Sequence, residues 1–239
     1  WVFPIAKRRL RARVPIDDRH VGFARLIDNP GGFRAAPIEP DKTIAVLQYT
    51  GGTTGVPKAA MLSHANVYAN AVQCERWFTD ARPGQERMIG VLPLFHVFAM
   101  TVVMNWSLRL GAEMILLPRF ELKQLLQTIH RKRPTAMAGV PTIFTAINNA
   151  PDRRRYDLSS LGYCLSGGAP LPVELKNNFE KLTKARLVEG YGLSECSPVV
   201  CCNPFNGTNK PGSIGLPYPR TVVEILSLDH AGRLPIGEK

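Results

Sequence analysis

The stretch TAMAGVPTIFTAINNA, Thr135–Ala150, places a strand directly before a helix. Its first six residues, 135–140, form a short apolar run of the length typical of a buried strand. Pro141 follows, and proline is favoured in the first turn of a helix because its missing N–H has no partner to lose there. Residues 141–150 are therefore predicted to be helical, and the stretch forms one strand–helix unit.

The same unit recurs on both sides of this stretch. Strands are predicted at residues 43–50, 59–63, 87–92, 112–117, 135–140, 161–166 and 185–190. Helices are predicted at residues 63–78, 97–110, 121–132, 141–150 and 171–184. Such alternation predicts an α/β fold, in which a mainly parallel sheet carries helices on both faces.

The chain changes character after Tyr191. Five prolines between residues 198 and 219, with several glycines, indicate a loop-rich segment. The last stretch, TVVEILSLDHAGRLPIGEK, Thr221–Lys239, reads as a strand, an Asp-His-Ala-Gly turn and the start of a return strand. This pattern predicts a β-hairpin at the end of the chain.

Composition excludes several classes of protein. With 45% apolar residues in 239, the chain is neither disordered nor fibrous. No apolar run approaches the roughly 20 residues that a membrane-spanning helix needs. The five cysteines are odd in number and form no CxxC pair, which favours reduced thiols and a cytoplasmic location.

The formal charge of +11 suits an anionic partner, namely nucleic acid, anionic lipid or a polyphosphate substrate. Much of it lies in residues 1–34, where WVFPIAKRRLRARV combines a basic cluster with aromatic and aliphatic residues. This is compatible with a membrane-surface contact, although a solvated basic linker or surface helix is the favoured interpretation. A second cluster, Arg153–Arg155, has no nucleic-acid-binding motif beside it, so no nucleic-acid partner is expected.

The stretch YTGGTTGVPKAAMLSH, Tyr49–His64, has the composition of a phosphate-binding loop. It is not a P-loop, because Lys58 follows Val56-Pro57 and Ala59 stands where that motif has a hydroxyl residue. Its glycines let backbone N–H groups approach an anion, while its threonines and its lysine add donors. Ser/Thr/Gly runs also form ordinary turns, so this loop alone leaves both interpretations open.

Two further glycine-containing loops follow predicted strands. LSGGAP spans Leu165–Pro170, and EGYGLSECSP spans Glu189–Pro198. In open α/β sheets, ligands bind at the carboxyl ends of the strands, where these loops begin. Tyr191 offers a flat face on which a base can stack, and the carboxylate of Glu195 suits Mg²⁺. Together the three loops indicate a nucleotide site.

The order and spacing of five stretches, YTGGTTGVPKAAMLSH, LPLFHVFAMT, GVPT, SGGAPLP and EGYGLSECSPVV, resemble the adenylate-forming acyl-CoA synthetases. The strongest likeness is to bacterial long-chain fatty acid–CoA ligases, and it covers Thr43–Lys239. The resemblance implies a reaction in two halves. A fatty acid carboxylate attacks the α-phosphorus of Mg·ATP, giving an acyl-adenylate and pyrophosphate, and the thiol of coenzyme A then displaces AMP.

The resemblance also implies roles for individual residues. The phosphate loop would consist of Thr50, Gly51, Gly52, Thr53, Thr54, Gly55 and Lys58. The adenine pocket would be lined by Gly167, Gly168, Ala169 and Pro170, Tyr191 would stack on the base, and Gly192 would also belong to the nucleotide-binding residues. Ser194 would reach the α-phosphate and Glu195 would bind Mg²⁺, so both count as catalytic residues together with His96.

His96 corresponds to a family position beside the reacting carboxylate. By the same resemblance, the acyl pocket would be lined by Phe95, His96, Phe98, Val140, Pro141 and Thr142. Without the resemblance, the apolar members of this set would be interpreted as core, and His96 as a structural histidine at a strand–helix junction.

Three segments are expected: a basic linker or peripheral segment at residues 1–43, a nucleotide- and acyl-binding core at 44–190, and a loop-rich segment with the start of a β-subdomain at 191–239. The family continues after Glu238 with a ribose-binding aspartate, a hinge and a small domain that carries the catalytic lysine. These 239 residues alone are thus expected to be inactive, and their exposed surfaces favour a homodimer. The expected location is cytoplasmic, peripheral on the inner face of a membrane.

Two alternatives stay open. The first is an adenylating ligase for another acid or acceptor, such as a fatty acyl-AMP ligase or a ligase for aryl or amino acids, because the loop chemistry is shared. The second is a basic module that binds RNA or an anionic membrane, as the net charge of +11 allows.

Overall fold

The computed structural model describes residues 17–28, 30–32, 34–50, 57–229, 232–235 and 237. The chain divides into two compact units, residues 1–38 and 39–239. In the described part of the first unit, α2, Phe23–Ile27, is a five-residue helix without a buried residue. The basic stretch at residues 1–16, for which a membrane contact is predicted, lies outside the described residues.

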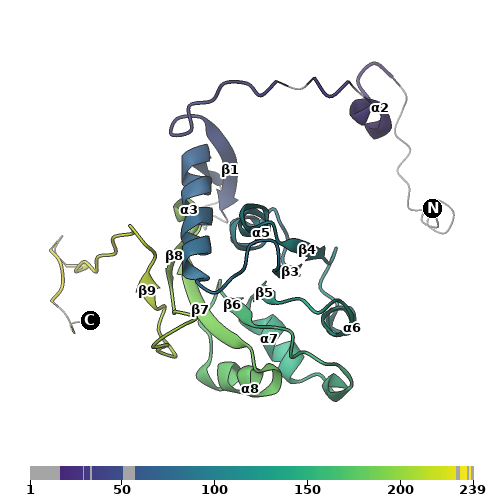
Figure 1. Cartoon of the computed structure of the whole chain (residues 1–239). Coiled ribbons are helices and arrows are strands. Elements are labelled where there is room, and N and C mark those ends of the chain that lie inside the picture. The colour runs from purple at the N-terminus through teal and green to yellow at the C-terminus, as the bar shows by residue number, and fades with distance from the viewer. Residues whose placement is uncertain are drawn as a thin grey trace. The chain divides into compact units, whose positions relative to one another are not determined.

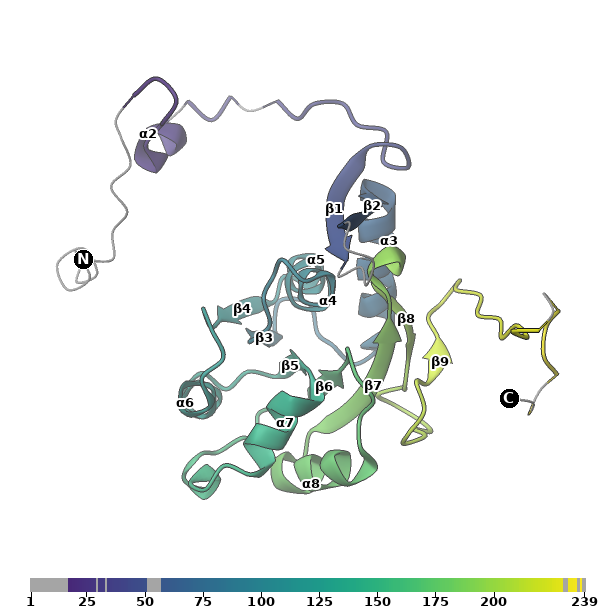
Figure 2. The ribbon, with the colours of Figure 1, turned by 180° about the vertical axis from the view of Figure 1, so that it is seen from behind.

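The second unit is built on a sheet with the strand order β4-β3-β5-β6-β7-β8-β9 (Figures 1 and 2). Its parallel strands, in that order, are β4 (Glu113–Leu116), β3 (Arg87–Gly90), β5 (Ala136–Gly139), β6 (Tyr163–Ser166) and β7 (Arg186–Gly192). The sheet continues with two antiparallel pairings: β8 (Val199–Cys202) pairs with β7, and β9 (Leu216–Pro217) pairs with β8. The prediction of a mainly parallel sheet is confirmed.

Helices cover both faces of this sheet, as predicted. The helices of the second unit are α3 (His64–Trp77), α4 (Val97–Ala99), α5 (Trp106–Leu110), α6 (Leu122–Lys132), α7 (Pro141–Asn148) and α8 (Val173–Thr183). Successive strand residues point to opposite faces. In β3, Met88 packs into the cluster with α3, α4 and α5, whereas its neighbour Ile89 packs into the cluster with α6, α7 and α8.

A separate two-stranded antiparallel sheet carries the phosphate-loop stretch. It consists of β1, Ile44–Thr50, and β2, Lys58–Ser63, with Thr50 opposite Lys58 at the end where the connecting loop begins. The predicted strands at 43–50 and 59–63 are thus both present. The residues that join them, 51–56, lie outside the described part of the chain.

The segment predicted as one helix at 97–110 is less regular than expected. It begins as α4, continues as a π-helix, Met100–Asn105, and ends as α5, with Gly111 at φ 66° as its C-cap. The residues of the π-helix are mostly buried, so tertiary packing rather than local sequence decides this irregularity. A helix in this position was nevertheless expected, and it stops where the glycine predicts.

The end of the chain departs from the expectation. The predicted loop-rich segment contains β8 and β9, because β7 offers its free edge to Val199–Cys202. The predicted β-hairpin is reduced, among the described residues, to a single antiparallel bridge between Leu226 and Arg233. No helix in the described ranges combines the length and the hydropathy needed to cross a membrane.

Candidate nucleotide and acyl site

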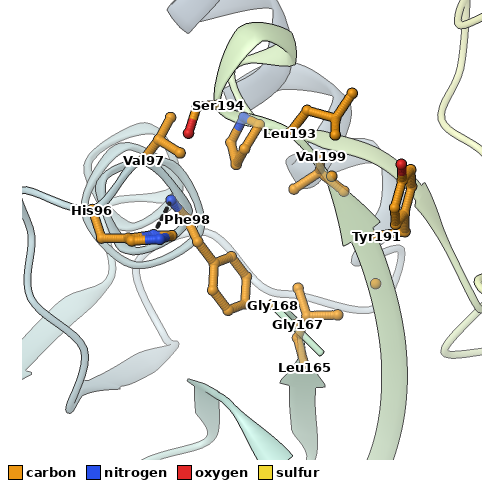
Figure 3. A pocket seen from close by; sticks show the side chains of 13 residues that line it. His96, Val97, Phe98, Leu165, Gly167, Gly168, Tyr191, Leu193, Ser194 and Val199 are labelled. Carbon is orange, nitrogen blue, oxygen red and sulfur yellow. Dashed lines mark hydrogen bonds between the residues drawn. The ribbon is translucent and has the colours of Figure 1, made fainter. Parts of the chain in front are cut away.

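A cavity of about 200 Å³ opens at the carboxyl ends of β6 and β7 (Figure 3). Three segments that are distant in sequence meet there: the start of α4, the turn after β6, and the turn between β7 and β8. Its lining consists of His96, Val97, Phe98, Leu165, Gly167, Gly168, Gly190, Tyr191, Gly192, Leu193, Ser194, Pro198 and Val199. This is the edge of the sheet at which the sequence predicts a ligand.

His96 is fixed at the mouth of this cavity by the helix that it begins. It is the N-cap of α4, and its Nδ1 accepts a hydrogen bond of 3.2 Å from the backbone N–H of Phe98 (Figure 3). The ring itself remains exposed. A polar ring is therefore held in one orientation beside the cavity, and its second nitrogen has no hydrogen bond to the described residues.

Two turns that form the cavity contain a glycine with little room for a side chain, and at Gly192 the backbone leaves no room at all. At Gly167, a Cβ would lie 3.1 Å from the ring of Phe98, which is itself buried. At Gly192, a Cβ would lie 2.2 Å from the carbonyl oxygen of Pro198. Bare backbone is thus exposed to a ligand at both turns, while Phe98 and Leu165 provide an apolar wall.

The turn between β7 and β8 is held in place by buried polar side chains. Asn70 of α3 pairs with the backbone of Val199, donating to its carbonyl at 2.8 Å and accepting from its N–H at 3.0 Å. Thr101 of the π-helix donates to the carbonyl of Ser197 at 2.9 Å. Sequence reasoning missed both residues, although a polar residue inside an otherwise apolar helix stripe is a usable signal.

The turn also positions the residues predicted to bind the base and the metal. Tyr191 and Ser194 line the cavity, and Ser194 begins a 3₁₀ turn, Ser194–Cys196, on which the carboxylate of Glu195 is exposed. Within the described ranges, no cluster of three or more His, Cys, Asp or Glu could enclose a metal. Mg²⁺ usually takes one or two protein carboxylates together with phosphate oxygens, so Glu195 fits that ion.

Two nearby ionisable groups have raised pKa values. Burial raises the pKa of Glu189 in β7, and a hydrogen bond from the backbone of Leu171 partly offsets this effect. Burial, together with the charge of Glu195, raises the pKa of the Cys196 thiol. Cys196 is therefore in its neutral thiol form and is no candidate nucleophile.

The described part of the phosphate-loop stretch consists of its two ends. Thr50 and Lys58 are paired across the hairpin, and the Thr50 hydroxyl donates to the Lys58 carbonyl at 3.4 Å. β2, which begins at Lys58, contacts the Ser194–Cys196 turn. The other predicted residues of this loop lie outside the described residues; they are Gly51, Gly52, Thr53, Thr54 and Gly55.

The residues predicted to line an acyl pocket are divided between two cavities. His96 and Phe98 line the cavity described above. Phe95 and Thr142 line a second, mostly apolar cavity of about 740 Å³ between the ends of β3 and β4 and the start of α7. Val140 and Pro141, although described, line neither. The lining of the first cavity also lacks Ala169 and Pro170, which are exposed beside it.

Comparison with known proteins gives consistent results. The family described as AMP-binding enzyme matches residues 7–239. The chain is 53% identical, over 80% of its length and 34% of the relative's, to a long-chain-fatty-acid–CoA ligase of Bacillus subtilis. Thus it spans about a third of that relative. It also resembles two solved structures.

The first is a long-chain-fatty-acid–CoA ligase of Archaeoglobus fulgidus, with a TM-score of 0.77 and 27% identity over 86% of this chain and 42% of that one. The second is an anthranilate CoA ligase in complex with anthranoyl-AMP, with a TM-score of 0.73 and 26% identity over 82% of this chain and 37% of that one. The predicted adenylate-forming fold is therefore confirmed.

Proposed function

The chain belongs to the AMP-binding enzyme family, and from this premise we propose that the full-length protein activates a long-chain fatty acid with ATP and transfers it to coenzyme A. In the first half-reaction, a carboxylate oxygen of the fatty acid attacks the α-phosphorus of ATP and pyrophosphate leaves. In the second, the sulfur of coenzyme A attacks the acyl carbon and AMP leaves. The 53% identity to a ligase of this specificity supports the proposal.

The observation that carries the proposal is the meeting of His96, Tyr191 and Ser194 at one cavity. The Tyr191 ring stacks on the adenine, against the bare backbone of Gly167 and Gly168. The Ser194 hydroxyl donates to an α-phosphate oxygen. His96 lies next to the fatty acid carboxylate. These residues hold two reactants in line and donate hydrogen bonds to developing charge, which is how phosphoryl transfer is mainly catalysed.

Glu195 is the residue that holds Mg²⁺ in this proposal. The ion, when bound, neutralises part of the phosphate charge. Lys58 and Thr50 flank the predicted phosphate loop, and Lys58 donates a charge-assisted hydrogen bond to the β- and γ-phosphates. The contact between β2 and the Ser194–Cys196 turn supports this assignment, because it places the strand that begins at Lys58 beside the turn that carries Glu195.

The acyl chain occupies apolar space next to the carboxylate position. Phe98 and Leu165 form the wall nearest the reacting centre, and the larger cavity beside Phe95 and Thr142 is apolar enough to hold a chain. Each methylene transferred from water to such a lining contributes about 0.8 kcal/mol. Longer chains are therefore expected to bind more tightly until the space is filled.

The experiment is acid-dependent exchange of labelled pyrophosphate into ATP by the full-length protein. The panel runs from acetate through long-chain fatty acids to aryl and amino acids, each with and without Glu195→Gln. Exchange that rises with chain length and is lost in the variant supports the proposal. If no acid supports exchange, the chain keeps these motifs without the chemistry, and a basic binding module becomes the better interpretation.

A second candidate is a ligase for an aryl acid. It is favoured by one observation, the similarity to an anthranilate CoA ligase whose structure holds anthranoyl-AMP. The same panel separates the two, because exchange with aryl acids that exceeds exchange with fatty acids assigns the site to the ring-containing substrate. Formation of the thioester after addition of coenzyme A then identifies the acceptor.

A further inference from the structure

A basic face lies at the end of the sheet opposite the candidate site. In a parallel sheet flanked by helices, the helices return to the amino ends of the strands, so the C-terminal ends of α6, α7 and α8 lie toward that end of the sheet. Figure 1 shows α7 beside α8, with α6 to one side of them. Six cations on or near these ends have no ion-pair partner among the described residues: Arg131, Lys132, Arg153, Arg154, Lys181 and Lys184.

Contacts join the three helix ends into one surface. The backbone N–H of Asp157 donates to His130 of α6 at 3.1 Å, and the side chain of Asp157 pairs with Arg133 at the end of the same helix. This ties the segment after α7 to α6. The other side of that segment meets α8, because Arg153, Arg154 and Lys181 line a common recess.

The recess is a polar hollow of about 570 Å³. Its lining consists of Asn148, Asn149, Arg153, Arg154, Asn178, Lys181 and Leu182. None of these residues carries a carboxylate, whereas three carry a positive charge and three carry an amide. The amide of Asn148 already donates to the carbonyl of Leu175 at 3.1 Å. The remaining guanidinium, ammonium and amide donors of the recess match the oxygens of a phosphate group.

The carboxylates of the same segments are already engaged. Asp152 accepts from the hydroxyl of Tyr156 at 3.3 Å, and Glu180 pairs with Lys176 at 2.5 Å. Hydrogen bonds from Ser159, followed by the pairing with Arg133, lower the pKa of Asp157 to about 2. Lys176 offsets the charge of Glu180 and Arg133 offsets that of Asp157, so of these acids Asp152 alone can offset the three cations of the recess. A net positive charge remains there, and this part of the surface attracts anions.

We propose that the basic face docks on anionic phospholipid bilayers, with a headgroup phosphate entering the recess between Arg153, Arg154 and Lys181. A bilayer suits this face better than nucleic acid, because its lining offers cations and amides but no aromatic ring for a base. The only described ring beside it, Tyr156, packs edge-on against His130 with the centroids 6.3 Å apart.

Docking at this face leaves the candidate site free. The site opens at the carboxyl ends of the strands, whereas the recess lies at their amino ends. The choice of a bilayer also rests on the proposed function, since long-chain fatty acids partition into membranes. Bilayer attachment would then hold the enzyme where its substrate is concentrated while the nucleotide enters from the aqueous side.

The test is sedimentation of the full-length protein with vesicles of phosphatidylglycerol and phosphatidylcholine, and with vesicles of phosphatidylcholine alone. The variant combines Arg153→Gln, Arg154→Gln and Lys181→Gln. Each cation near an anionic surface contributes roughly five-fold to the affinity. Removal of three should therefore lower the affinity for the phosphatidylglycerol vesicles on the order of 100-fold. The matched control, Arg76→Gln with Lys123→Gln and Lys210→Gln, removes the same net charge from other surfaces and should leave most of the binding.

Other outcomes overturn the proposal. Equal losses in the two triple variants mean that net charge, not this face, attracts the vesicles. Displacement by inorganic phosphate at millimolar concentration identifies a free-anion site, and displacement by RNA at lower concentration than by vesicles identifies a nucleic-acid surface. Pyrophosphate exchange in the absence of vesicles is measured in parallel: its absence refutes the proposed function alone, whereas unchanged vesicle binding by the variant refutes docking alone.

Discussion

The β1–β2 hairpin and the β7–β8 turn contain similar kinds of residue. They differ in how the surrounding structure supports them. The hairpin is largely solvent-exposed, with Leu47 and Met61 both more than half exposed. The β7–β8 turn instead grows from buried strands and is tied to Asn70 and Thr101. If both regions bind the nucleotide as proposed, ligand binding and folding stability should be separable in the hairpin, whereas the same residues should serve both in the turn.

The largest loss of folding stability is expected for Gly192→Ala in the β7–β8 turn. The new Cβ would lie 2.2 Å from a backbone oxygen, which no rotamer can relieve, so the turn must shift. We expect a loss of about 3 kcal/mol in the free energy of unfolding, measured with urea, together with weaker ATP binding.

The control is Gly162→Ala, where the nearest atom is a backbone oxygen at 3.7 Å. That substitution should be close to neutral. If Gly192→Ala changed the free energy of unfolding as little as this control, the turn would adapt to a side chain as easily as an exposed loop does. The contrast with the hairpin would then disappear.

Asn70→Ala is expected to have the next largest effect. The variant leaves both the N–H and the carbonyl of Val199 without the partner that Asn70 provides, in a buried place. The free energy of unfolding should therefore fall by about 2 kcal/mol. ATP affinity should fall too, because Val199 lines the cavity. Asn177→Ala, at an exposed position of α8, is the control for helix propensity. A loss of stability with unchanged ATP affinity would show that the turn holds its shape without this anchor.

A smaller change in the free energy of unfolding is expected for Glu189→Gln, and this change should depend on pH. Burial raises the pKa of Glu189 above 4.5, so above that pH the folded state binds more protons than the unfolded state. Stability therefore falls as pH rises from 4.5 through the folded pKa. The variant lacks this dependence of stability on pH. Between pH 4.5 and the folded pKa, its stability relative to the wild type should therefore increase with pH, as measured by urea titrations. Glu174→Gln, in the exposed first turn of α8, should leave the slope intact.

The smallest effect on stability is expected for Lys58→Ala in the hairpin. Lys58 is exposed and has no ion-pair partner within the described ranges, so the urea midpoint should not change. The affinity for ATP should nevertheless fall about ten- to one-hundred-fold, as for the loss of a charge-assisted hydrogen bond. Lys42→Ala, just before the same hairpin, should change neither quantity. A shifted midpoint in Lys58→Ala would remove the separation that the comparison draws.

Local patterns predicted the parallel layers well. Apolar runs such as 135–140 and the proline at 141 specify strand and helix by themselves, and alternation then leaves few arrangements. Residues set by distant partners were not predictable in this way. β8 is a strand only because β7 offers it an edge, and the π-helix after α4 depends on how its residues pack.

The same distinction holds for the candidate site. The sequence predicted that Gly167, Tyr191 and Ser194 would meet, because all three follow strands at one edge of the sheet. It did not predict the anchors Asn70 and Thr101, which act through hydrogen bonds to residues about a hundred positions away. Nor did it separate Phe95 from Phe98, since neighbouring residues at the start of a helix can face different cavities.

The hydrogen bond from Phe98 to the Nδ1 of His96 has a chemical consequence for the ring. A nitrogen that accepts a backbone proton carries none itself, so the neutral imidazole holds its single proton on Nε2. While α4 keeps this cap, the Nε2 of His96 can only donate toward a ligand and cannot act as a base. In the proposed reaction, the side chain would then polarise or clamp an oxygen, and proton abstraction would come from elsewhere.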